Sequence, residues 1–411
     1  MKRKDIFKAV LHLSVLCMLI TAAAPVMASS DGFRYFGRLN ATVETYKSVT
    51  GETAVPAYLY LNLTGIDPID LGERTTLHLY GRISDDLTGE EDVESRLYLA
   101  YADVRGLFSV LDVRAGRQFV HTVAGSALTD GVDVRMEGVG GLLSFRVFGG
   151  GGVTFDDPYS SGDMVYGAAV DVVGHDPLVL GLSYFRKDED SETVREALGL
   201  EAEYRFGSTA RVYGETRYDM FSESTEYYLV GAKYRPTEAL RLGAEYSYSV
   251  PVFDADDVYS VFAVDERKDL TVDAAYGVTG NFDVLGIYTR EFAVDLKDTD
   301  IFEGGFEARN PGSSRVRASV LYGYGEDRWH GARLHAEIYP SEKTEFGGGA
   351  EYQAYERLGM QDMERASMAY LDGKYRFTRD VSAYLYLESM TGTVMGTENS
   401  ALIKLTYDFR G

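Results

Sequence analysis

The sequence has 411 residues and a formal net charge of −23 at pH 7, from 41 Lys and Arg against 64 Asp and Glu. A chain this acidic is a poor partner for nucleic acid. It is also 45% hydrophobic, with 31 tyrosines and 20 phenylalanines, which excludes an acidic disordered protein. Its single cysteine is Cys17, so the chain beyond it has no disulfide, thiolate metal site or C-x-x-C-H haem attachment.

The first 28 residues have the pattern of a secretory signal peptide. A basic start, MKRKDIFK, precedes the apolar run AVLHLSVLCMLITAAA, and small residues flank the expected cleavage site after Ala28. The run is shorter than the ~20 apolar residues of a spanning helix, which disfavours an uncleaved anchor. Leu16 precedes Cys17 where a lipid-attachment motif needs a small residue, which disfavours a lipoprotein. Four basic residues and one acidic residue give segment 1–28 a net charge of +3, so residues 29–411 carry −26.

Beyond Ala28, segments of about ten residues alternate between apolar and polar side chains. In chain order, clear examples cover residues 74–84, 195–206, 208–219, 238–249, 314–325, 331–340 and 380–390. In 195–206, Leu198 and Leu200 share one face of a strand, and Glu201 and Glu203 share the other. The polar faces combine Arg with Glu and Asp, and no domain break interrupts the pattern. We therefore expect residues 29–411 to form an all-β, antiparallel, up-and-down transmembrane barrel rather than a soluble sandwich.

The connectors between these segments form two interleaved series. One series is short and rich in turn residues, for example FGS, RPTE, TGN and PSEK, and the other is longer and acidic, for example SDDLTGEEDVE, TFDDPYSSGD and KDEDSE. Short turns on one rim and longer loops on the other are typical of a barrel with both ends in the periplasm. The pattern predicts about 22 strands, within a range of 18–22, and no plug domain.

Aromatic residues lie near the ends of several segments, as in Tyr204 with Phe206 and Tyr375 with Phe377. Such positions favour aromatic girdles at the membrane interfaces. The final stretch, NSALIKLTYDFRG, alternates in the same way and predicts the closing strand. Its spaced aromatics, Tyr407 and Phe409, resemble the C-terminal signal of bacterial outer-membrane barrels, although the chain ends on DFRG rather than on the aromatic residue.

The stretch LDVRAGRQFVHTVAGSALTDGVDVRME differs from the rest, because the strand carrying Asp112 and Arg114 leads through GRQF into a Gly, Ser and Ala loop. It resembles porins of Gram-negative bacteria, in which a GRQ strand precedes a third external loop that folds into the pore after the fifth strand. The resemblance implies that this loop, at about 119–130, narrows the pore. The implied constriction and pore-lining residues are Asp112, Arg114, Arg117, Gln118, His121, Asp130, Asp133, Arg135, Arg211, Glu215, Arg217 and Arg333. The alternative is that these are ordinary paired wall charges.

The resemblance implies an outer-membrane porin, a passive channel for ions or small polar solutes that lies among lipid and lipopolysaccharide. Selection would then depend on pore width and on the charges that line it. In a barrel with 22 strands and no plug, either the lumen is wide, or loops at about 119–130 and 250–267 fold inward, or a partner fills it. A sheath around a multihaem cytochrome is therefore the alternative function, and a homo-oligomer stays open. We expect no enzyme, cofactor or metal site, because neither H-E-x-x-H spacing nor a G-x-S-x-G motif occurs.

Overall fold

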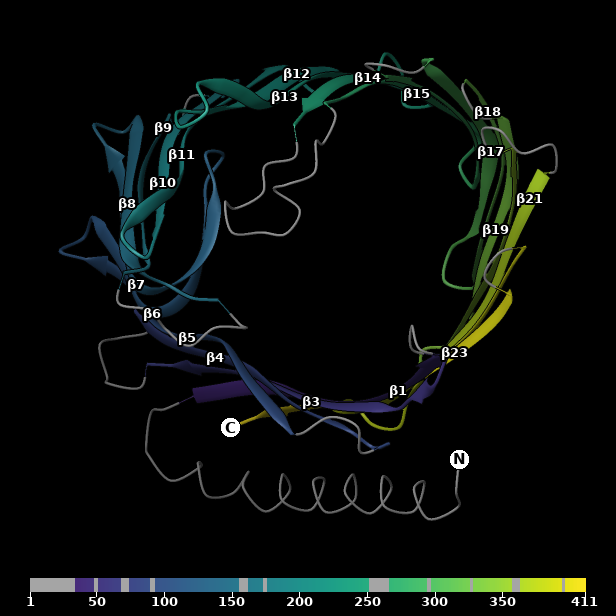
Figure 1. Ribbon diagram of the computed structural model, residues 1–411, viewed down its shortest axis with the longest axis horizontal. Coiled ribbons are helices and arrows are strands. Elements are labelled where there is room, and N and C mark those ends of the chain that lie inside the picture. The colour runs from purple at the N-terminus through teal and green to yellow at the C-terminus, as the bar shows by residue number, and fades with distance from the viewer. Residues whose placement is uncertain are drawn as a thin grey trace.

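A computed structural model describes residues 34–47, 51–67, 74–88, 93–154, 162–172, 176–250, 266–293, 297–325, 328–356, 363–393 and 396–411 (Figure 1). The expected signal peptide, residues 1–28, lies outside them. The strands are β1 (Arg34–Lys47), β2 (Thr53–Ala54), β3 (Pro56–Ile66), β4 (Thr75–Asp86), β5 (Glu94–Leu107), β6 (Leu111–His121), β7 (Ser126–Val139), β8 (Leu143–Gly152), β9 (Met164–Val172), β10 (Leu178–Glu189), β11 (Glu192–Phe206), β12 (Ala210–Asp219), β13 (Ser224–Tyr234), β14 (Leu240–Ser249), β15 (Arg267–Thr279), β16 (Phe282–Phe292), β17 (Thr299–Asn310), β18 (Ser314–Tyr324), β19 (Arg328–Ser341), β20 (Thr344–Glu356), β21 (Met363–Arg376), β22 (Val381–Gly392) and β23 (Gly396–Arg410). Within these ranges, no helix is long and apolar enough to cross a membrane.

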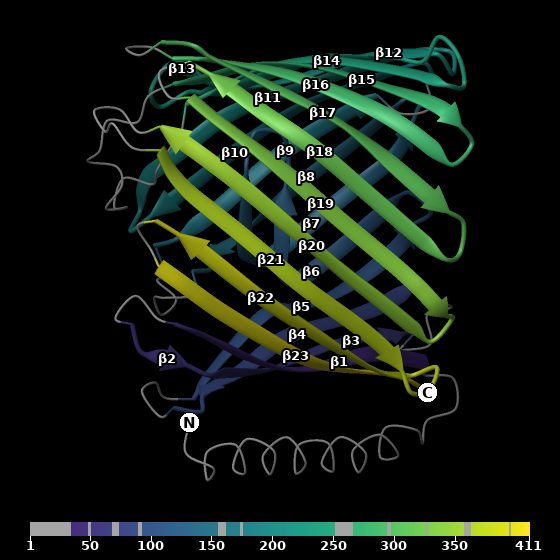
Figure 2. The same ribbon diagram turned by 90° about the vertical axis from the view of Figure 1, so that its right-hand side faces the viewer.

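The strands close into a single barrel. Each long strand pairs antiparallel with the next one along the chain, and β23 pairs with β1 from Phe36 opposite Arg410 to Thr45 opposite Ala401. β2 is a two-residue strand that pairs only with the end of β1, so the barrel wall consists of the other 22 strands. Figure 1 looks down the resulting ring, and Figure 2 shows the strands inclined across the wall. The predicted fold and strand number are confirmed.

The longest connectors lie on one rim, as predicted, although that rim also has short ones such as 220–223. The rim at which β1 begins and β23 ends carries the short connectors, such as 207–209, 280–281 and 342–343. The opposite rim carries longer ones, such as 153–163 and 250–266. The acidic stretch KDEDSE was predicted to be a long loop, and that is wrong. Only Asp190 and Ser191 connect β10 to β11, because both have positive φ angles (48° and 71°) and close a two-residue hairpin.

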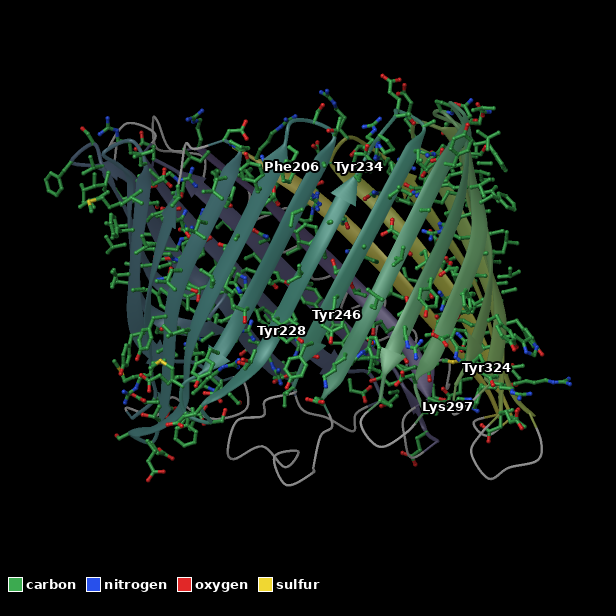
Figure 3. All side chains as sticks on the ribbon, turned by 90° about the horizontal axis from the view of Figure 1, so that it is seen from above. Phe206, Tyr228, Tyr234, Tyr246, Lys297 and Tyr324 are labelled. Atoms are coloured by element: carbon green, nitrogen blue, oxygen red, sulfur yellow. The ribbon has the colours of Figure 1, made fainter. Side chains whose placement is uncertain are left out.

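The outer face is apolar, and this makes the barrel a membrane-spanning one. Outward side chains such as Leu182, Val230, Leu371 and Ile403 are 54%, 56%, 66% and 59% exposed. A closed sheet can present such a surface to lipid, because its backbone groups are all paired within the wall. Figure 3 shows Phe206 and Tyr234 near one rim, and Tyr228, Tyr246 and Tyr324 toward the other. The expected aromatic girdles are therefore present at both interfaces.

The C-terminal strand closes the barrel as predicted. On its outer face, the ring of Phe409 lies 5.9 Å from that of Tyr407 and 6.4 Å from that of Tyr35. On its inner face, Asp408 accepts a 2.6 Å hydrogen bond from Nε of Arg38 on β1. Tyr35 and Gly411 exchange two backbone hydrogen bonds at the rim, so the seam between the first and last strands is continuous.

Candidate functional site

A hairpin formed by β6 and β7 leaves the wall and enters the barrel. The pairing between β5 and β6 ends at Ala100 opposite Arg117, whereas β6 and β7 stay paired up to His121 opposite Ser126. Beyond Arg117 the hairpin therefore separates from β5 and runs across the interior toward β11 (Figure 1). We call residues 117–130 the inner hairpin. It follows the fifth long strand of the barrel, which is where the sequence placed the inward segment.

The inner hairpin is not the long loop that the sequence predicted for residues 119–130. Only residues 122–125 connect the two strands, and the pairing of β6 with β7 continues through Phe119 opposite Leu128. The turn is closed by mutual backbone hydrogen bonds between Thr122 and Gly125, of 2.8 and 3.2 Å. The small residues of this stretch thus form a tight turn and allow close packing, and they do not form a long loop. The second predicted inward loop, 250–267, lies almost entirely outside the described residues.

Three glycines form the crease at which the hairpin bends inward. Gly116, Gly131 and Gly150 lie opposite one another on β6, β7 and β8. A Cβ on Gly131 would lie 2.2 Å from the carbonyl oxygen of Gly149, and one on Gly116 would lie 2.3 Å from that of Ala100. Gly116 also has a φ of +121°, which favours glycine. Only glycine lets three adjacent strands approach and bend in this way.

The tip of the hairpin is packed against the inner wall by an apolar cluster. Val120 and Ala124 of the hairpin are fully buried. Their partners on the wall are Phe148, Val165, Phe185 and Ala197, from β8, β9, β10 and β11, and each is at most 2% exposed. Burying an apolar side chain of this size contributes about 1.5–3 kcal/mol. A small dry core therefore holds the hairpin against this part of the wall.

Hydrogen bonds fix the position of the tip. Nε of Arg217 on β12 donates to the carbonyl of Val123 at 2.8 Å, and the amide of Ala124 donates to Oγ of Ser183 at 3.0 Å. Arg217 also contacts Glu226, a carboxylate whose side chain is 7% exposed, at 3.2 Å. Arg195 contacts the same Glu226 oxygen at 2.5 Å. Glu226, which both arginines contact, therefore holds Arg217 where it can bind the hairpin.

Four of the predicted site residues come together at the base of the hairpin. Asp112, Arg114, Asp133 and Arg135 line a charged crevice of about 430 Å³ on the inner wall. Arg114 lies 3.4 Å from Asp103 on β5, and Asp133 forms a 2.7 Å ion pair with Arg146 on β8. The other lining residues of the crevice are Asp103, Arg105 and Glu137. The crevice thus combines both signs of charge.

The predicted residues of the hairpin itself lie on two different faces. Gln118 is fully buried between the hairpin and the wall, where its amide donates to the carbonyl of Gly131 at 3.2 Å. Arg117 and Asp130 form a bidentate ion pair, at 2.7–2.8 Å, on the opposite face. His121 also lies on that face, with its ring stacked 6.5 Å from Phe119. Of these four, only Gln118 is cut off from the open interior.

The remaining predicted residues lie on the inner wall away from the crease. Arg211, Glu215 and Arg217 occupy alternate positions of β12, and Arg333 on β19 lies 3.1 Å from Glu351. The structure does not bring Arg333 near the inner hairpin, because β19 lies on another part of the ring (Figure 1).

An acidic row begins beside the tip of the hairpin, and sequence reasoning named only its member Glu215. Asp171, Glu201 and Glu215 share one inward-facing row across β9 to β12, with Gly181 between the first two. In the part of the chain that the structure describes, no lysine or arginine nitrogen lies within 4.0 Å of these three carboxylates. A Cβ on Gly199, two residues before Glu201, would lie 2.3 Å from the amide nitrogen of Ala124, so the tip adjoins the row. Strand register, which the sequence does not give, is what assembles it.

No arrangement for metal binding is present among the described residues, where no three His, Cys, Asp or Glu side chains converge on one point. The candidate site combines an inward-folded hairpin with charged inner walls, inside a membrane-spanning β-barrel.

No protein-family model matches the sequence, and no curated protein matches it. Solved structures similar to this chain include Pseudomonas aeruginosa OccK3 (OpdO), with a TM-score of 0.45 and 11% identity over 92% of this chain and 96% of that one. Acinetobacter baumannii OccAB1 has a TM-score of 0.46 and 11% identity, over 92% and 97% of the two chains. Pseudomonas aeruginosa OpdQ has a TM-score of 0.46 and 10% identity, over 93% and 100%. At these identities and TM-scores, the function has to be inferred from the geometry of the barrel itself.

Proposed function

We propose that the protein is a porin, a passive channel for ions or small polar solutes in the outer membrane of a Gram-negative bacterium. The observation that carries this proposal is the closed ring of 22 long strands with an apolar outside and a charged inside. Barrels of 16–18 strands already leave a water-filled channel, and the width grows with strand number. Hydrophobic residues facing lipid and ionic residues facing inward are the arrangement that water-filled barrels need.

The inner hairpin is the constriction of the proposed channel. It covers the inner face of β8 to β11 and takes up part of the cross-section, while β12 to β22 keep a polar inner face. Its fastening by Arg217 and by the apolar cluster keeps this narrowing in place. Arg117 and Asp130 lie where the hairpin leaves the wall, with Arg117 3.2 Å from the carbonyl oxygen of Leu97 on β5, and His121 is exposed near the tip, so these are the hairpin residues that a passing solute would meet.

The channel is expected to prefer cations. The carboxylates of Asp171, Glu201 and Glu215 lack a lysine or arginine partner within the described residues, whereas arginines on the same part of the wall contact carboxylates. Arg205 and Arg211, for example, both contact Glu203, at 2.6 and 3.7 Å. Unpaired carboxylates beside a constriction attract cations and repel anions.

Segment 1–28 is proposed to be a cleaved signal peptide and 29–411 the barrel, surrounded by lipid and lipopolysaccharide. A catalytic function is not part of the proposal. A sheath around a cytochrome is less well supported, since the inner hairpin occupies space that a large partner would need.

The test is single-channel recording of the purified barrel in planar bilayers. We expect a steady open current whose reversal potential in a KCl gradient indicates cation preference. A perfectly cation-selective channel would give a reversal potential of about 59 mV for a tenfold gradient, and we expect a value between zero and that limit. A silent barrel would refute the channel, and co-purification of a haem absorbance band would favour the sheath instead.

A further inference from the structure

Three aromatic rings lie next to one another on the inner wall, on a part of the ring that the inner hairpin does not reach (Figure 1). The ring of Tyr370 on β21 lies 6.1 Å from that of His335 on β19 and 5.7 Å from that of Tyr386 on β22, with an interplanar angle of 28° in both cases. Leu371 and Leu387, the residues that follow Tyr370 and Tyr386, are 66% and 43% exposed on the outside, so alternation turns the rings inward. We call these three rings the aromatic platform.

A glycine lets the central ring of the platform lie flat on the wall. Gly349 on β20 lies between His335 and Tyr370 in the strand register. A Cβ on Gly349 would lie 2.6 Å from Cε1 and 2.7 Å from Cζ of Tyr370, so the ring rests directly on the backbone there. A 2.6 Å hydrogen bond joins the hydroxyl of Tyr370 to Nδ1 of His335, and a 2.9 Å one joins Nε2 of His335 to Glu337. One face of the Tyr370 ring is thus fixed against the wall, and the other is turned to the interior.

A polar cavity adjoins the platform on the side of the short connectors. Its volume is about 940 Å³, within the ~300–1,000 Å³ range of small-molecule sites. Tyr384 lines it, two residues before Tyr386 on the same face of β22, and Lys374 and Lys404 flank Tyr384 in the register. Among the described residues, no carboxylate oxygen lies within 4.0 Å of either lysine. The lining has six basic and five acidic side chains, so the cavity offers donors and acceptors with little net charge.

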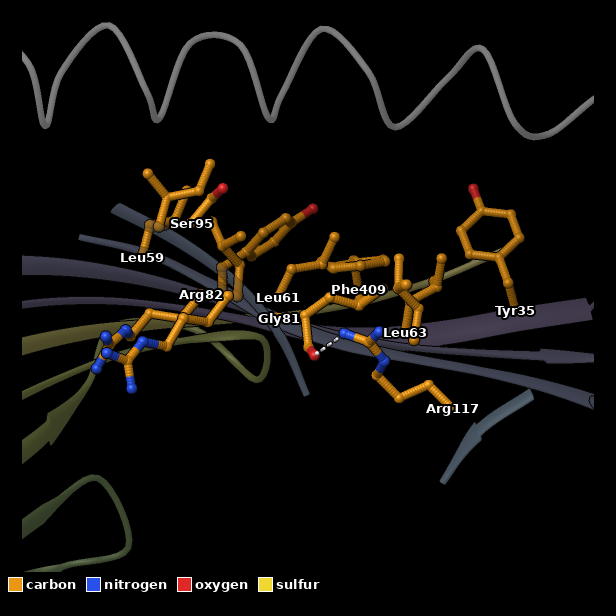
Figure 4. Close-up of a pocket in the computed structure, with 15 residues that line it drawn as sticks. Tyr35, Leu59, Leu61, Leu63, Gly81, Arg82, Ser95, Arg117 and Phe409 are labelled. Atoms are coloured by element: carbon orange, nitrogen blue, oxygen red, sulfur yellow. Dashed lines mark hydrogen bonds between the residues drawn. The ribbon is translucent and has the colours of Figure 1, made fainter. Parts of the chain in front are cut away.

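A second series of aromatic rings lies on β3 and β4. The ring of Tyr60 is 6.1 Å from that of Tyr58 and 6.4 Å from that of Tyr80, with interplanar angles of 35° and 16°. Figure 4 shows Leu61 on one side of the wall and the guanidinium of Arg82 on the other. Because Tyr80 shares a face with Arg82, and Tyr58 and Tyr60 alternate with the outward leucines of β3, the three rings point inward.

Strand pairing places the two sets of rings on one path. Tyr384 pairs with Lys404, Lys404 with Thr42, and Thr42 with Tyr58. Tyr58 therefore lies three strands from Tyr384, or roughly 14 Å at about 4.8 Å per strand. Polar side chains fill the interval, so rings and hydrogen-bonding groups alternate along the inner wall from β19 to β4.

This alternation matches the chemistry of a neutral sugar chain. A pyranose ring has an apolar face of C–H bonds, which packs on an aromatic face, and a rim of hydroxyls, which need donors and acceptors. A flat aromatic solute would use the rings but not the polar groups between them. A small ion would use the polar groups but not the rings. Only a chain of several sugar units meets both along the whole path.

We propose that the aromatic platform, the cavity and the second series of rings bind a neutral oligosaccharide. Its pyranose rings lie on Tyr370, Tyr386 and Tyr60, and its hydroxyls bond to the side chains between them. Each contact is weak and there are several in a row, as passage through a channel requires. Passage of the sugar rests on the proposed channel function, whereas its binding is measurable on a barrel that does not conduct.

The test is isothermal titration calorimetry of the full barrel in lauryldimethylamine oxide, a detergent without a sugar headgroup. Maltohexaose, cellopentaose and xylohexaose are titrated in turn, with glucose and nicotinamide as references. We expect at least one oligosaccharide to bind at least tenfold more tightly than glucose, because only a chain reaches several rings. Failure of all three to exceed glucose would refute the site. Tighter binding of nicotinamide than of all three would refute the proposed occupant, since it would indicate a site for flat aromatic solutes.

Variants of the platform locate the binding. Tyr370→Ala is expected to raise the Kd of the preferred oligosaccharide about tenfold, whereas Tyr370→Phe, which keeps the ring, should change it less than threefold. Gly349→Ala keeps every ring but pushes Tyr370 off the wall, so it should weaken binding severalfold. Tyr322→Ala is the matched control, because it removes a tyrosine that is 51% exposed on the outside, and it should leave the Kd unchanged.

Tyr386→Ala keeps the test valid if Tyr370→Ala does not fold. Parental affinity in the folded variants of both positions would refute the platform. Conductance of the same preparation separates this inference from the channel function. A conducting barrel that binds no oligosaccharide overturns only the sugar site, and a silent barrel that binds one overturns only the channel.

Discussion

Two sectors of the barrel wall are both apolar on the outside, but one has an apolar inner face and the other an ionic one. Under the inner hairpin, β8 to β11 present Phe148, Val165, Phe185 and Ala197, all at most 2% exposed. Across the ring, β12 to β18 present ion pairs such as Arg241 with Asp283 at 3.0 Å. The outward residues are apolar in both sectors, for instance Leu182 and Val230. The inner face of this barrel therefore carries exposed ion pairs where it is open to the interior, and under the hairpin it becomes an apolar core with the buried pair of Arg146 and Asp133 beside it.

The largest effect is expected from blocking the crease. Gly131→Val would place a side chain 2.2 Å from the carbonyl oxygen of Gly149, so the hairpin could not bend onto the covered sector. We expect the free energy of unfolding in lipid vesicles to fall by about 3 kcal/mol or more, at the upper end of overpacking costs. Urea titration followed by electrophoretic mobility measures it. Gly286→Val is the matched control, since a Cβ there meets nothing within 4 Å; equal destabilisation by both changes would contradict the crease.

A charge in the covered sector is expected to release the hairpin. Phe185→Asp buries a carboxylate in the apolar cluster, at a cost of several kcal/mol unless the hairpin undocks and admits water. The expected outcome is a severalfold rise in single-channel conductance with the barrel still closed. Leu229→Asp makes the same chemical change on the inner face of the open sector and should leave conductance nearly unaltered. Unchanged conductance of Phe185→Asp would show that the hairpin does not limit the current.

Loss of the arginine contact is expected to loosen the hairpin without releasing it. Arg217→Gln removes the 2.8 Å hydrogen bond to Val123 and one of the two cations on Glu226. A hydrogen bond to a charged group contributes about 1.5–3 kcal/mol, so brief transitions to larger conductance levels should appear in recordings. Arg241→Gln removes an ion pair of the open sector and should add none. If both variants record as steadily as the parent, Arg217 does not position the hairpin.

The smallest effect is expected from neutralising the acidic row. Glu201→Gln combined with Glu215→Gln removes two carboxylates that lack a cationic partner among the described residues, beside the tip of the hairpin. The reversal potential in a KCl gradient should move toward zero, while the total conductance changes little. Glu238→Gln, in an exposed connector of the opposite rim, should leave the potential where it was. A larger shift from Glu238→Gln than from the double variant would place the selectivity elsewhere.

The fold could be predicted from the sequence because alternation assigns each residue a face. Leu198 and Leu200 lie outside and Glu201 and Glu203 inside, as the sequence predicted, because lipid contact requires one face of every strand to be apolar. The alternation did not show that β10 and β11 continue through the acidic stretch KDEDSE, beyond the apolar belt, to a turn at Asp190 and Ser191.

The arrangement of the candidate site could be predicted only in part. The GRQ stretch indicated the segment, but alternation runs unbroken through Arg117, Gln118 and Phe119, and nothing local shows that the strand leaves the wall there. The bend depends on three glycines that become neighbours only through the strand register. The docking of the hairpin depends on Arg217, which is 94 residues from Val123 in the sequence. Whether the predicted residues line a conducting pore stays a prediction for the recordings above.

The dependence of the hairpin on Arg217 also has a consequence for biogenesis. The wall residues that hold the hairpin extend to Ala197 on β11 and Arg217 on β12, so it is not fully fixed until these strands have joined the sheet. Contacts between such distant segments form late, because the loop that connects them must first be closed. A newly inserted barrel would therefore first be wide and leaky, and it would narrow as one of the last steps of its maturation.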